Sequence, residues 1–321
     1  MGKSVLLAYS AVVLCTGYEL EPYRGDNYVQ PISDKTLESF GFDVNGEMKI
    51  IWITSYPKSG NTWVRSIVAS LLYTAEGIFN FDLFKLITQF DKKTNYEFIQ
   101  TLSDNDYKKF NKDLACISKY WIEAQKRIIN SKELNPVYNI FKTHSANLYL
   151  NNNNRYTSEE TTRGFIYIIR DPRDVVVSFS KHLNKNIDDT ISVMTSNGAM
   201  TTPSDNRTLT LISSWNMHYE SWNTLKTPFL ILKYEDLLKN IEFEVKRIIE
   251  FLGKLLEINV KDLNKKLDGV CKTTNINKFI EYENKFGFGE ATKNQKFFSK
   301  IQSNSKKELS IGQTKTIEEK F

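Results

Sequence analysis

The sequence predicts an α/β protein, built as a single domain with a mostly parallel central sheet flanked by helices. Short apolar runs rich in β-branched residues recur along the chain, and amphipathic helical segments separate them. The first of these runs leads through a glycine-containing loop into a helix. Strands that alternate with helices are typical of parallel sheets, because parallel neighbours need a crossover connection. The length of 321 residues fits one such domain.

The first half of the chain contains three predicted strands. These runs are short, apolar and bounded by polar segments: 48–55, 137–142 and 164–170. Apolar residues at helical spacing follow the first strand at 62–73. Residues 80–135 mix aromatic and charged side chains, and we expect them to be mainly helical and to shape a pocket. The asparagine run at 151–154 predicts a polar loop.

The second half continues the same alternation. Asp171-Pro172 predicts a helix start, because proline is favoured in the first helical turn. A helix is expected at 175–183, followed by an aperiodic loop or lid at 190–208 and a helix at 209–225. A strand follows at 229–234, then a helix that begins at Glu235 and another at 241–253. The domain is therefore expected at 48–300, between an N-terminal extension at 1–47 and a polar tail at 301–321.

Composition limits the classes of function. A net charge of +5 suits an anionic small ligand and is too weak to indicate a nucleic-acid partner. Three cysteines without pair spacing predict reduced thiols and a cytoplasmic protein. Three histidines among scattered cysteines offer no zinc-ligand pattern, so no metal is expected. The apolar run Val5–Cys15 is too short to span a membrane; a buried element is favoured over a secretion signal.

The loop after the first strand has the character of an anion site. It reads Pro57-Lys58-Ser59-Gly60-Asn61-Thr62-Trp63 and opens the helix. Backbone N–H groups from Ser59 to Trp63 can surround an anion at a helix start, where the helix dipole adds to the attraction. Lys58 can stabilise charge that develops as a bond breaks, Asn61 and Thr62 add donors, and Trp63 can pack against a flat base. A Walker A loop places its lysine after the second glycine, whereas here lysine precedes Gly60.

Two later segments end strands at the same predicted sheet edge. Arg170 closes the third strand and faces the crevice where ligands of α/β proteins bind. Ser178 lies about two helical turns further on, on a face that can turn towards the same anion. Lys142 and His144 close the second strand, and a histidine is suited to accept a proton near neutral pH. The alternative for Arg170 is a helix cap with paired Arg and Asp.

These segments together resemble the PAPS-dependent sulfotransferase family, where PAPS is 3′-phosphoadenosine 5′-phosphosulfate. Tyr56–Trp63 resembles the family's 5′-phosphosulfate loop, and Ile51–Arg65 is similar to its bacterial members. The likeness extends over about residues 48–300 and is most specific in this loop and in Ile169–Ser178. It implies the P-loop-like sulfotransferase fold, transfer of a sulfuryl group from PAPS to a hydroxyl or amine, and PAP (3′-phosphoadenosine 5′-phosphate) as product, with no metal required.

The resemblance also implies roles for individual residues. Arg170 and Ser178 would hold the donor's 3′-phosphate, while Lys142 would stabilise the transferring group and His144 would act as the base. Matches on the adenine side and in the C-terminal lid add four residues to the expected donor site: Tyr234, Thr274, Phe298 and Lys300. Thr274 is preferred to Ile276, which departs from the family's pattern.

The C-terminal lid also departs from the family. Ser299 and Ile301 stand where the family has Arg and Gly, and no Gly-x-Trp follows. The family's dimerisation motif is not recognisable, so the oligomeric state stays open. Two other hypotheses therefore remain, a P-loop-type nucleotide or small-molecule kinase and a non-catalytic nucleotide-binding protein. A small-molecule acceptor, such as a secondary metabolite, is the expected partner, with no role for nucleic acid or membrane.

Overall fold

The computed structural model describes residues 49–131, 138–150, 153–258, 262–288, 290, 296–298 and 308–321. The predicted extension at 1–47, with its apolar run Val5–Cys15, lies outside the described residues. So do Lys300 and the predicted end of the domain beside it. Within the described part, no helix has both the length and the apolar character that crossing a membrane demands.

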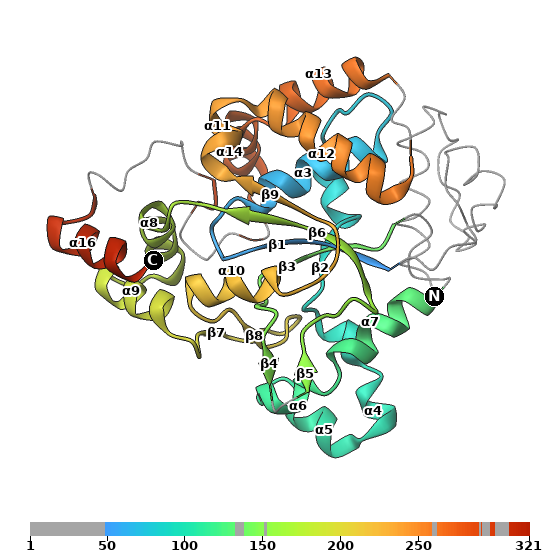
Figure 1. Ribbon diagram of the computed structural model, residues 1–321, viewed down its shortest axis with the longest axis vertical. Coiled ribbons are helices and arrows are strands. Elements are labelled where there is room, and N and C mark those ends of the chain that lie inside the picture. Colours follow the sequence, from blue (N-terminus) through green and yellow to red (C-terminus); the bar gives the residue numbers. More distant parts are fainter. Residues whose placement is uncertain are drawn as a thin grey trace.

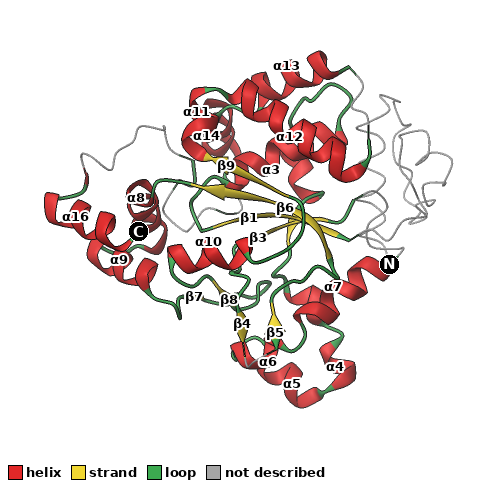
Figure 2. Ribbon diagram, in the orientation of Figure 1, coloured by secondary structure: helices red, strands yellow, loops and turns green. Residues whose placement is uncertain are grey.

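A five-stranded parallel sheet forms the centre of the molecule (Figures 1 and 2). Its strands lie in the order β2-β3-β1-β6-β9, with bounds Thr88–Gln89, Ile140–Thr143, Ile50–Ser55, Thr162–Ile169 and Phe229–Lys233. This confirms the predicted fold class, and four of the five strands match predicted runs. The edge strand β2 was not expected, because it lies inside a segment whose composition indicated helix.

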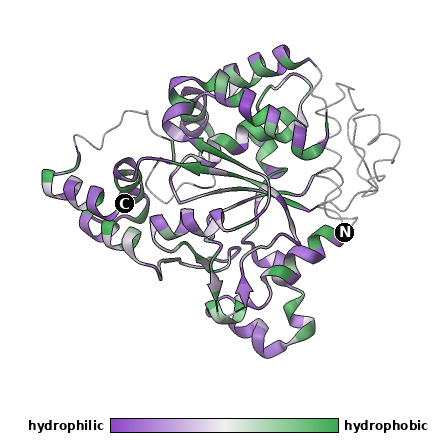
Figure 3. Cartoon of the chain, in the orientation of Figure 1, coloured by the Kyte–Doolittle hydropathy of each residue, from purple (hydrophilic) through white to green (hydrophobic). Residues whose placement is uncertain are grey.

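The central strands β1 and β6 are buried on both faces, which explains why they are largely apolar, whereas the edge strand β9 is partly exposed. Ile51 and Ile53 of β1 pack into one core cluster, and Ile50 and Trp52 pack into another on the opposite face. Figure 3 shows the central strands mainly in the hydrophobic colour, whereas the short surface helix α5 (Asp104–Lys109) is mainly hydrophilic.

Helices cover the two faces in separate groups (Figure 1). One face carries α3 (Asn61–Tyr73), α11 (Tyr234–Lys239), α12 (Ile241–Leu256), α13 (Leu263–Thr273) and α14 (Ile276–Phe286). The short helix η1 (Phe81–Lys85) packs with α3 on this face. The other face carries η2 (Lys93–Tyr96), α4 (Ile99–Leu102), α5, α6 (Leu114–Ser118), α7 (Trp121–Asn130) and α10 (Trp215–Asn223). The expected helical character of 80–135 is confirmed, in shorter pieces than a single helix.

A third group of helices lies beyond the carboxyl end of β6. It contains α8 (Pro172–Leu183), α9 (Ile187–Thr195) and α16 (Ile311–Lys320), which pack around Val176, Met194 and Ile317. The C-terminal part of the expected polar tail is therefore a packed helix, which begins with a capping box at Ser310.

The prediction of an aperiodic loop at 190–208 was wrong in its first part. Helix α9 continues to Thr195, because Asn186 caps its start and Ile191 and Met194 are buried against its neighbours. Further on, β7 (Met200–Thr201) pairs with β8 (Thr210–Leu211) in a small antiparallel ladder.

Two further boundaries differ from the prediction. The helix expected from residue 209 starts only at Trp215, where the Ser214 side chain accepts a hydrogen bond from the N–H of Met217. Next to the predicted asparagine loop, β4 (Tyr149–Leu150) pairs with β5 (Asn154–Arg155). In both places, pairing between segments decided the local structure.

Candidate active site

The carboxyl ends of four parallel strands surround a cavity of about 740 Å³. Strand β1 lies between β3 and β6, so the chain leaves the sheet in different directions from neighbouring strands and opens a crevice there. Lys58, His144, Arg170 and Tyr234 follow β1, β3, β6 and β9 respectively, and all four line the cavity. The volume is within the usual range for small-ligand sites.

The loop before α3 has the backbone that an anion site requires. Lys58 and Gly60 both have positive φ angles, of 66° and 101°. A Cβ at residue 60 would lie 2.6 Å from Cδ2 of Tyr234, so only glycine lets the loop approach that ring. The Lys58 ammonium group lies 4.0 Å from the centre of the Phe297 ring. The loop is thus packed from the C-terminal side of the chain as well as by β1.

Several buried polar atoms in and beside this loop have no hydrogen-bond partner among the described residues. They are Ser59 Oγ, Asn61 Oδ1, Trp63 Nε1 and Arg170 Nε. Buried polar groups are normally paired, so unpaired ones at a cavity are typical of a site that a polar ligand completes. Three of these residues, Asn61, Trp63 and Arg170, line the cavity, whereas Ser59 lies behind the lining. The arrangement fits a bound nucleotide with anionic groups.

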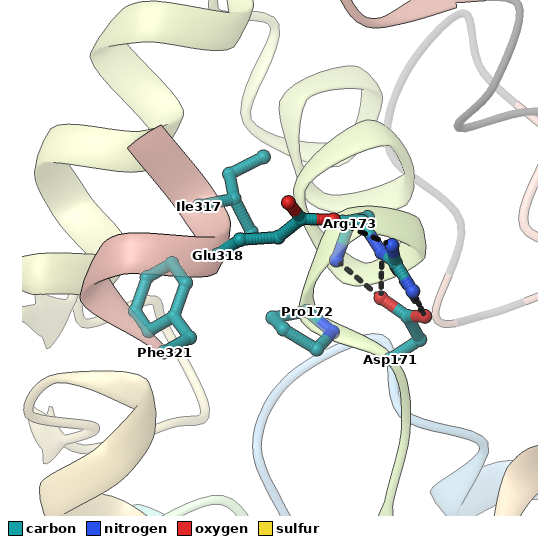
Figure 4. Close-up of a pocket in the computed structure, with 6 residues that line it drawn as sticks. All are labelled: Asp171, Pro172, Arg173, Ile317, Glu318 and Phe321. Atoms are coloured by element: carbon teal, nitrogen blue, oxygen red, sulfur yellow. Dashed lines mark hydrogen bonds and ion pairs between the residues drawn. The ribbon is translucent and has the colours of Figure 1, made fainter. Parts of the chain in front are cut away.

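The segment after β6 divides its charges between structure and cavity. Asp171 caps α8 by accepting from the N–H of Arg173, and the Arg173 side chain pairs with both Asp171 and Glu318 of α16 (Figure 4). A separate hollow of about 390 Å³ lies at this junction. The capping interpretation is therefore correct for Asp171 and Arg173, while Arg170 faces the main cavity.

Arg170 is held in place on two sides. Its Nη1 donates to the carbonyl oxygen of Lys58 at 3.0 Å, and its guanidinium lies 4.3 Å from the centre of the Tyr234 ring. Trp63 packs edge-on against the same ring. Ser178 lines the cavity from the second turn of α8. Arginine held rigidly beside a hydroxyl suits recognition of a phosphate group.

His144 has the tautomer that a general base needs. Its Nδ1 lies 2.8 Å from the carbonyl oxygen of Ser55, which can only accept, so Nδ1 carries the hydrogen. In the neutral ring Nε2 then has the free lone pair. Burial, with the nearby Lys142, holds the pKa of His144 well below its ordinary value. The imidazole is therefore neutral at neutral pH, with a lone pair on Nε2.

Lys142 lies two residues before His144 and faces a carboxylate. Its Nζ is 3.0 Å from Oε2 of Glu290, and Oε1 of Glu290 is 2.9 Å from Nη2 of Arg65. Thr62 Oγ1 is 3.4 Å from the same Oε2 atom. Burial lowers the pKa of Lys142 to about 8, although Glu290 opposes this change. Burial and the neighbouring Arg170 likewise lower the pKa of Lys58 to about 8.

A buried network fixes the end of β3. Asp91 accepts hydrogen bonds from Thr143 at 3.0 Å and from the Tyr156 hydroxyl at 3.1 Å. Burial raises the pKa of Asp91 to about 6, although these two hydrogen bonds oppose the change. Thr143 lies between Lys142 and His144, so the network sets the direction in which both side chains leave the strand.

The other predicted donor residues fall into three groups. Phe298 lines the cavity, and its N–H donates to Glu283 of α14 at 2.8 Å. Thr274 is fully buried behind the lining, with its hydroxyl donating to the carbonyl of Val270. Ile276 lines the cavity in its place, contrary to the stated preference for Thr274. Lys300 lies outside the described residues.

The comparisons with known proteins identify the family. The family model for the sulfotransferase domain matches residues 49–320. The chain belongs to the sulfotransferase family. Sulfotransferase 1B1 of the dog (Canis lupus familiaris) is 27% identical over 228 residues, which are 66% of this chain and 62% of that protein. The chain thus aligns with less than two thirds of that relative.

Solved sulfotransferase structures share the fold. Mouse sulfotransferase SULT7A1 complexed with PAP superposes with a TM-score of 0.52 at 19% identity, covering 89% of this chain and 88% of that one. Retinol dehydratase in complex with retinol and PAP gives 0.53 at 19% identity, with coverage of 87% and 81%. The complex of retinol dehydratase with androsterone and PAP superposes with a TM-score of 0.53 at 18% identity, covering 84% of this chain and 78% of that one.

Some residues of this cavity were not predicted. Glu290 is the main example, since it contacts Lys142 across 148 positions of sequence. His182 of α8 also lines the cavity, and burial, with Lys58 and Lys142, lowers its pKa to about 4. Arg207, in the segment before β8, and Gln89 of β2 also line the cavity. Each comes from a segment with no strand-end or loop motif to indicate it.

Proposed function

We propose that this sulfotransferase transfers a sulfuryl group from PAPS to a hydroxyl or amine of a small-molecule acceptor, with His144 as the base. The observation that carries the proposal is that one cavity brings the loop at 57–63 and Arg170 together with Lys142 and His144. A cradle for two anionic groups and a neutral imidazole therefore open into the same space.

The donor would bind on the side of β1, β6 and β9. Lys58, Thr62 and the backbone N–H of Asn61 would hold the 5′-phosphosulfate at the start of α3, where the helix dipole favours an anion. The Asn61 side chain instead donates to Ile53 and Ser55 of β1. Arg170 and Ser178 would hold the 3′-phosphate, with Arg170 set by the Lys58 carbonyl and the Tyr234 ring. Trp63, Ile276 and the Phe297–Phe298 pair offer flat or apolar surfaces for the adenine.

The acceptor would bind on the side of β3, where His144 can reach its hydroxyl or amine. When bound, the donor supplies an electrophilic sulfur whose leaving group is a phosphate. His144 Nε2 would take the acceptor's proton, while the Nδ1–H bond to Ser55 keeps the ring in one tautomer and orientation. Lys58 and Lys142 would neutralise negative charge on opposite sides of the transferring group, as in-line transfer requires.

The acceptor side of the cavity has a mixed lining. Apolar surface comes from Leu183, Val193 and Ile212. Polar side chains come from β2, β7, β8 and the segments beside them: Gln89, Thr201, Arg207 and Thr210. Retinol dehydratase, which shares this fold, holds the small molecules retinol and androsterone in its two complexes. We propose a small but more polar acceptor here, such as a secondary metabolite, and a reaction in the cytoplasm.

The test is direct. Radiolabelled PAPS is incubated with the enzyme and a panel of hydroxyl and amine acceptors, with and without EDTA, and PAP binding is measured by calorimetry. We expect PAP to bind and at least one acceptor to be labelled in the presence of EDTA. Magnesium-dependent ATP turnover without PAP binding would favour the kinase hypothesis. PAP binding without labelling of any acceptor would favour a non-catalytic nucleotide-binding protein.

A further inference from the structure

Glu290 brings a carboxylate to the place where the cavity's cations meet. Its Oε2 atom lies between Lys142 Nζ, at 3.0 Å, and Thr62 Oγ1, at 3.4 Å. The side chain lines the cavity and is only 17% exposed. Thr62 lies in the first turn of α3, and Lys142 lies next to the end of β3, so the carboxylate bridges the donor side to the acceptor side.

Arg65 fixes the carboxylate from behind. The guanidinium is 4% exposed, lies 4.2 Å from the centre of the Phe84 ring, and pairs with Glu290 Oε1 at 2.9 Å. Burial would raise the pKa of Glu290, but Lys142 and Arg65 outweigh it and hold this pKa well below its ordinary value. Glu290 therefore carries its negative charge at neutral pH.

A fixed negative charge here conflicts with the proposed chemistry. Lys142 is the cation assigned to the transferring sulfuryl group, and two anions cannot share its ammonium group without strong repulsion. PAP lacks the sulfuryl group, so it can bind while Glu290 stays on Lys142. The conflict therefore concerns the sulfuryl group of PAPS specifically.

We propose that Glu290 occupies the sulfuryl position of the empty enzyme, anchored by Arg65, and that the sulfonate of PAPS must displace it from Lys142. Glu290 is thus a specificity-determining residue that sets the affinity for substrate relative to product. It weakens PAPS binding and leaves PAP binding largely unaffected. This inference rests on the proposed function, because it assigns the sulfuryl group to the space beside Lys142.

The experiment measures the dissociation constants of PAP and PAPS, without acceptor, for the wild type and Glu290→Gln. Glutamine keeps the size of the side chain and removes its charge. We expect the affinity for PAPS relative to that for PAP to rise about tenfold in the variant, equivalent to about 1.4 kcal/mol. Arg65→Met, which releases the carboxylate from its anchor, should change this ratio in the same direction by a smaller factor.

A matched control separates this effect from general electrostatics. Asp174 lines the cavity from the first turn of α8, on the donor side. Asp174→Asn removes one negative charge there and should alter the affinities for PAP and PAPS by the same factor. Thermal unfolding of each variant, with and without PAP, shows whether the protein is folded and able to bind.

Each result decides the matter. An unchanged PAPS-to-PAP ratio in Glu290→Gln would overturn the proposal. So would a lower relative affinity for PAPS, which would show that Glu290 instead keeps Lys142 charged for the donor. If the wild type binds neither nucleotide, the proposed function fails and this inference fails with it. If both proteins bind PAP and PAPS, but the affinity for PAPS relative to PAP is the same in Glu290→Gln as in the wild type, the proposed function survives and this inference alone is wrong.

Discussion

The end of the cavity beside Arg170 and the end beside His144 are built from different kinds of structure. At the Arg170 end, short loops join parallel strands directly to helices α3, α8 and α11. At the His144 end, Lys142 lies in the central strand β3 and His144 follows it. Much of the remaining wall, among the described residues, comes from the two-residue strands β2, β7 and β8, the segments beside them, and helices α8 and α9.

This difference bears on what each end can do. Groups at strand ends are held by core packing on both faces of the sheet, so the Arg170 end is suited to one fixed ligand. Short ladders and loops tolerate change in sequence more easily, so under the proposed function the His144 end is the part that can vary to suit different acceptors. We therefore expect substitutions at the two ends to separate donor recognition from chemistry.

The largest expected effect comes from the His144 end. His144→Ala should lower kcat by about 10²- to 10⁴-fold, the usual contribution of a general base, while PAP affinity changes little. His182→Ala serves as the matched control, because His182 also lines the cavity and also has a lowered pKa; we expect a change below about tenfold on the same scale. Wild-type turnover by His144→Ala would remove the base assignment.

The next effect separates recognition of the 3′-phosphate at the other end. Arg170→Ala should weaken PAP binding by about 10- to 100-fold, because a charge-assisted hydrogen bond contributes about 1.5–3 kcal/mol. Binding of adenosine 5′-phosphate, which lacks that phosphate, should change much less. Arg173→Ala is the control, since this side chain pairs with Asp171 and Glu318 instead of facing the cavity. Equal losses for both nucleotides would contradict the assignment.

A backbone change tests whether the loop is as rigid as the comparison requires. Gly60→Ala places a Cβ 2.6 Å from the Tyr234 ring, at a φ of 101° that side chains rarely adopt. We expect a loss of about 1–3 kcal/mol in the free energy of unfolding, measured by denaturant titration, and weaker PAP binding. Gly198→Ala is the control, because no atom lies within 4 Å of a Cβ built there. Equal stability of both variants would show that the loop adapts.

The smallest expected effect is on the pH dependence of donor binding. Burial and Arg170 lower the pKa of Lys58 to about 8, so the ammonium group is charged below pH 8 and loses its charge as the pH rises. The charged fraction, and with it PAP affinity, should fall about threefold between pH 7.5 and 8.5. In Lys58→Arg this fall should be shallower, because arginine stays protonated. A fall of the same size in both proteins would assign the dependence to another group.

The two ends also differed in how well they could be predicted. The residues at the Arg170 end were predicted because each follows a short apolar run, and parallel strands bring their carboxyl ends to one edge. The exception is Thr274, for which Ile276 lines the cavity instead. The sequence pattern did not predict helix α14, which begins at Ile276. Which residue near the start of a helix faces a cavity depends on how that helix packs.

At the His144 end the local patterns were insufficient. The two-residue strands β2, β7 and β8 are too short to produce a period in the sequence, and the start of α9 lay outside the segment interpreted as a loop. Their partners are distant in the chain, as in the pairing of Thr88 with Phe141. Pairing of this kind is decided by the tertiary fold.

The sequence by itself determined the class of fold, the anion loop before α3, and the family to which the chain belongs. Apolar runs, turn residues and a motif of contiguous residues act locally, so they are visible in one dimension. Only the tertiary structure decided that Glu290 pairs with Lys142 and Arg65, that Arg173 is used to hold α16, and that His144 presents Nε2. Those outcomes depend on distances between segments far apart in the chain, which packing of the whole molecule sets.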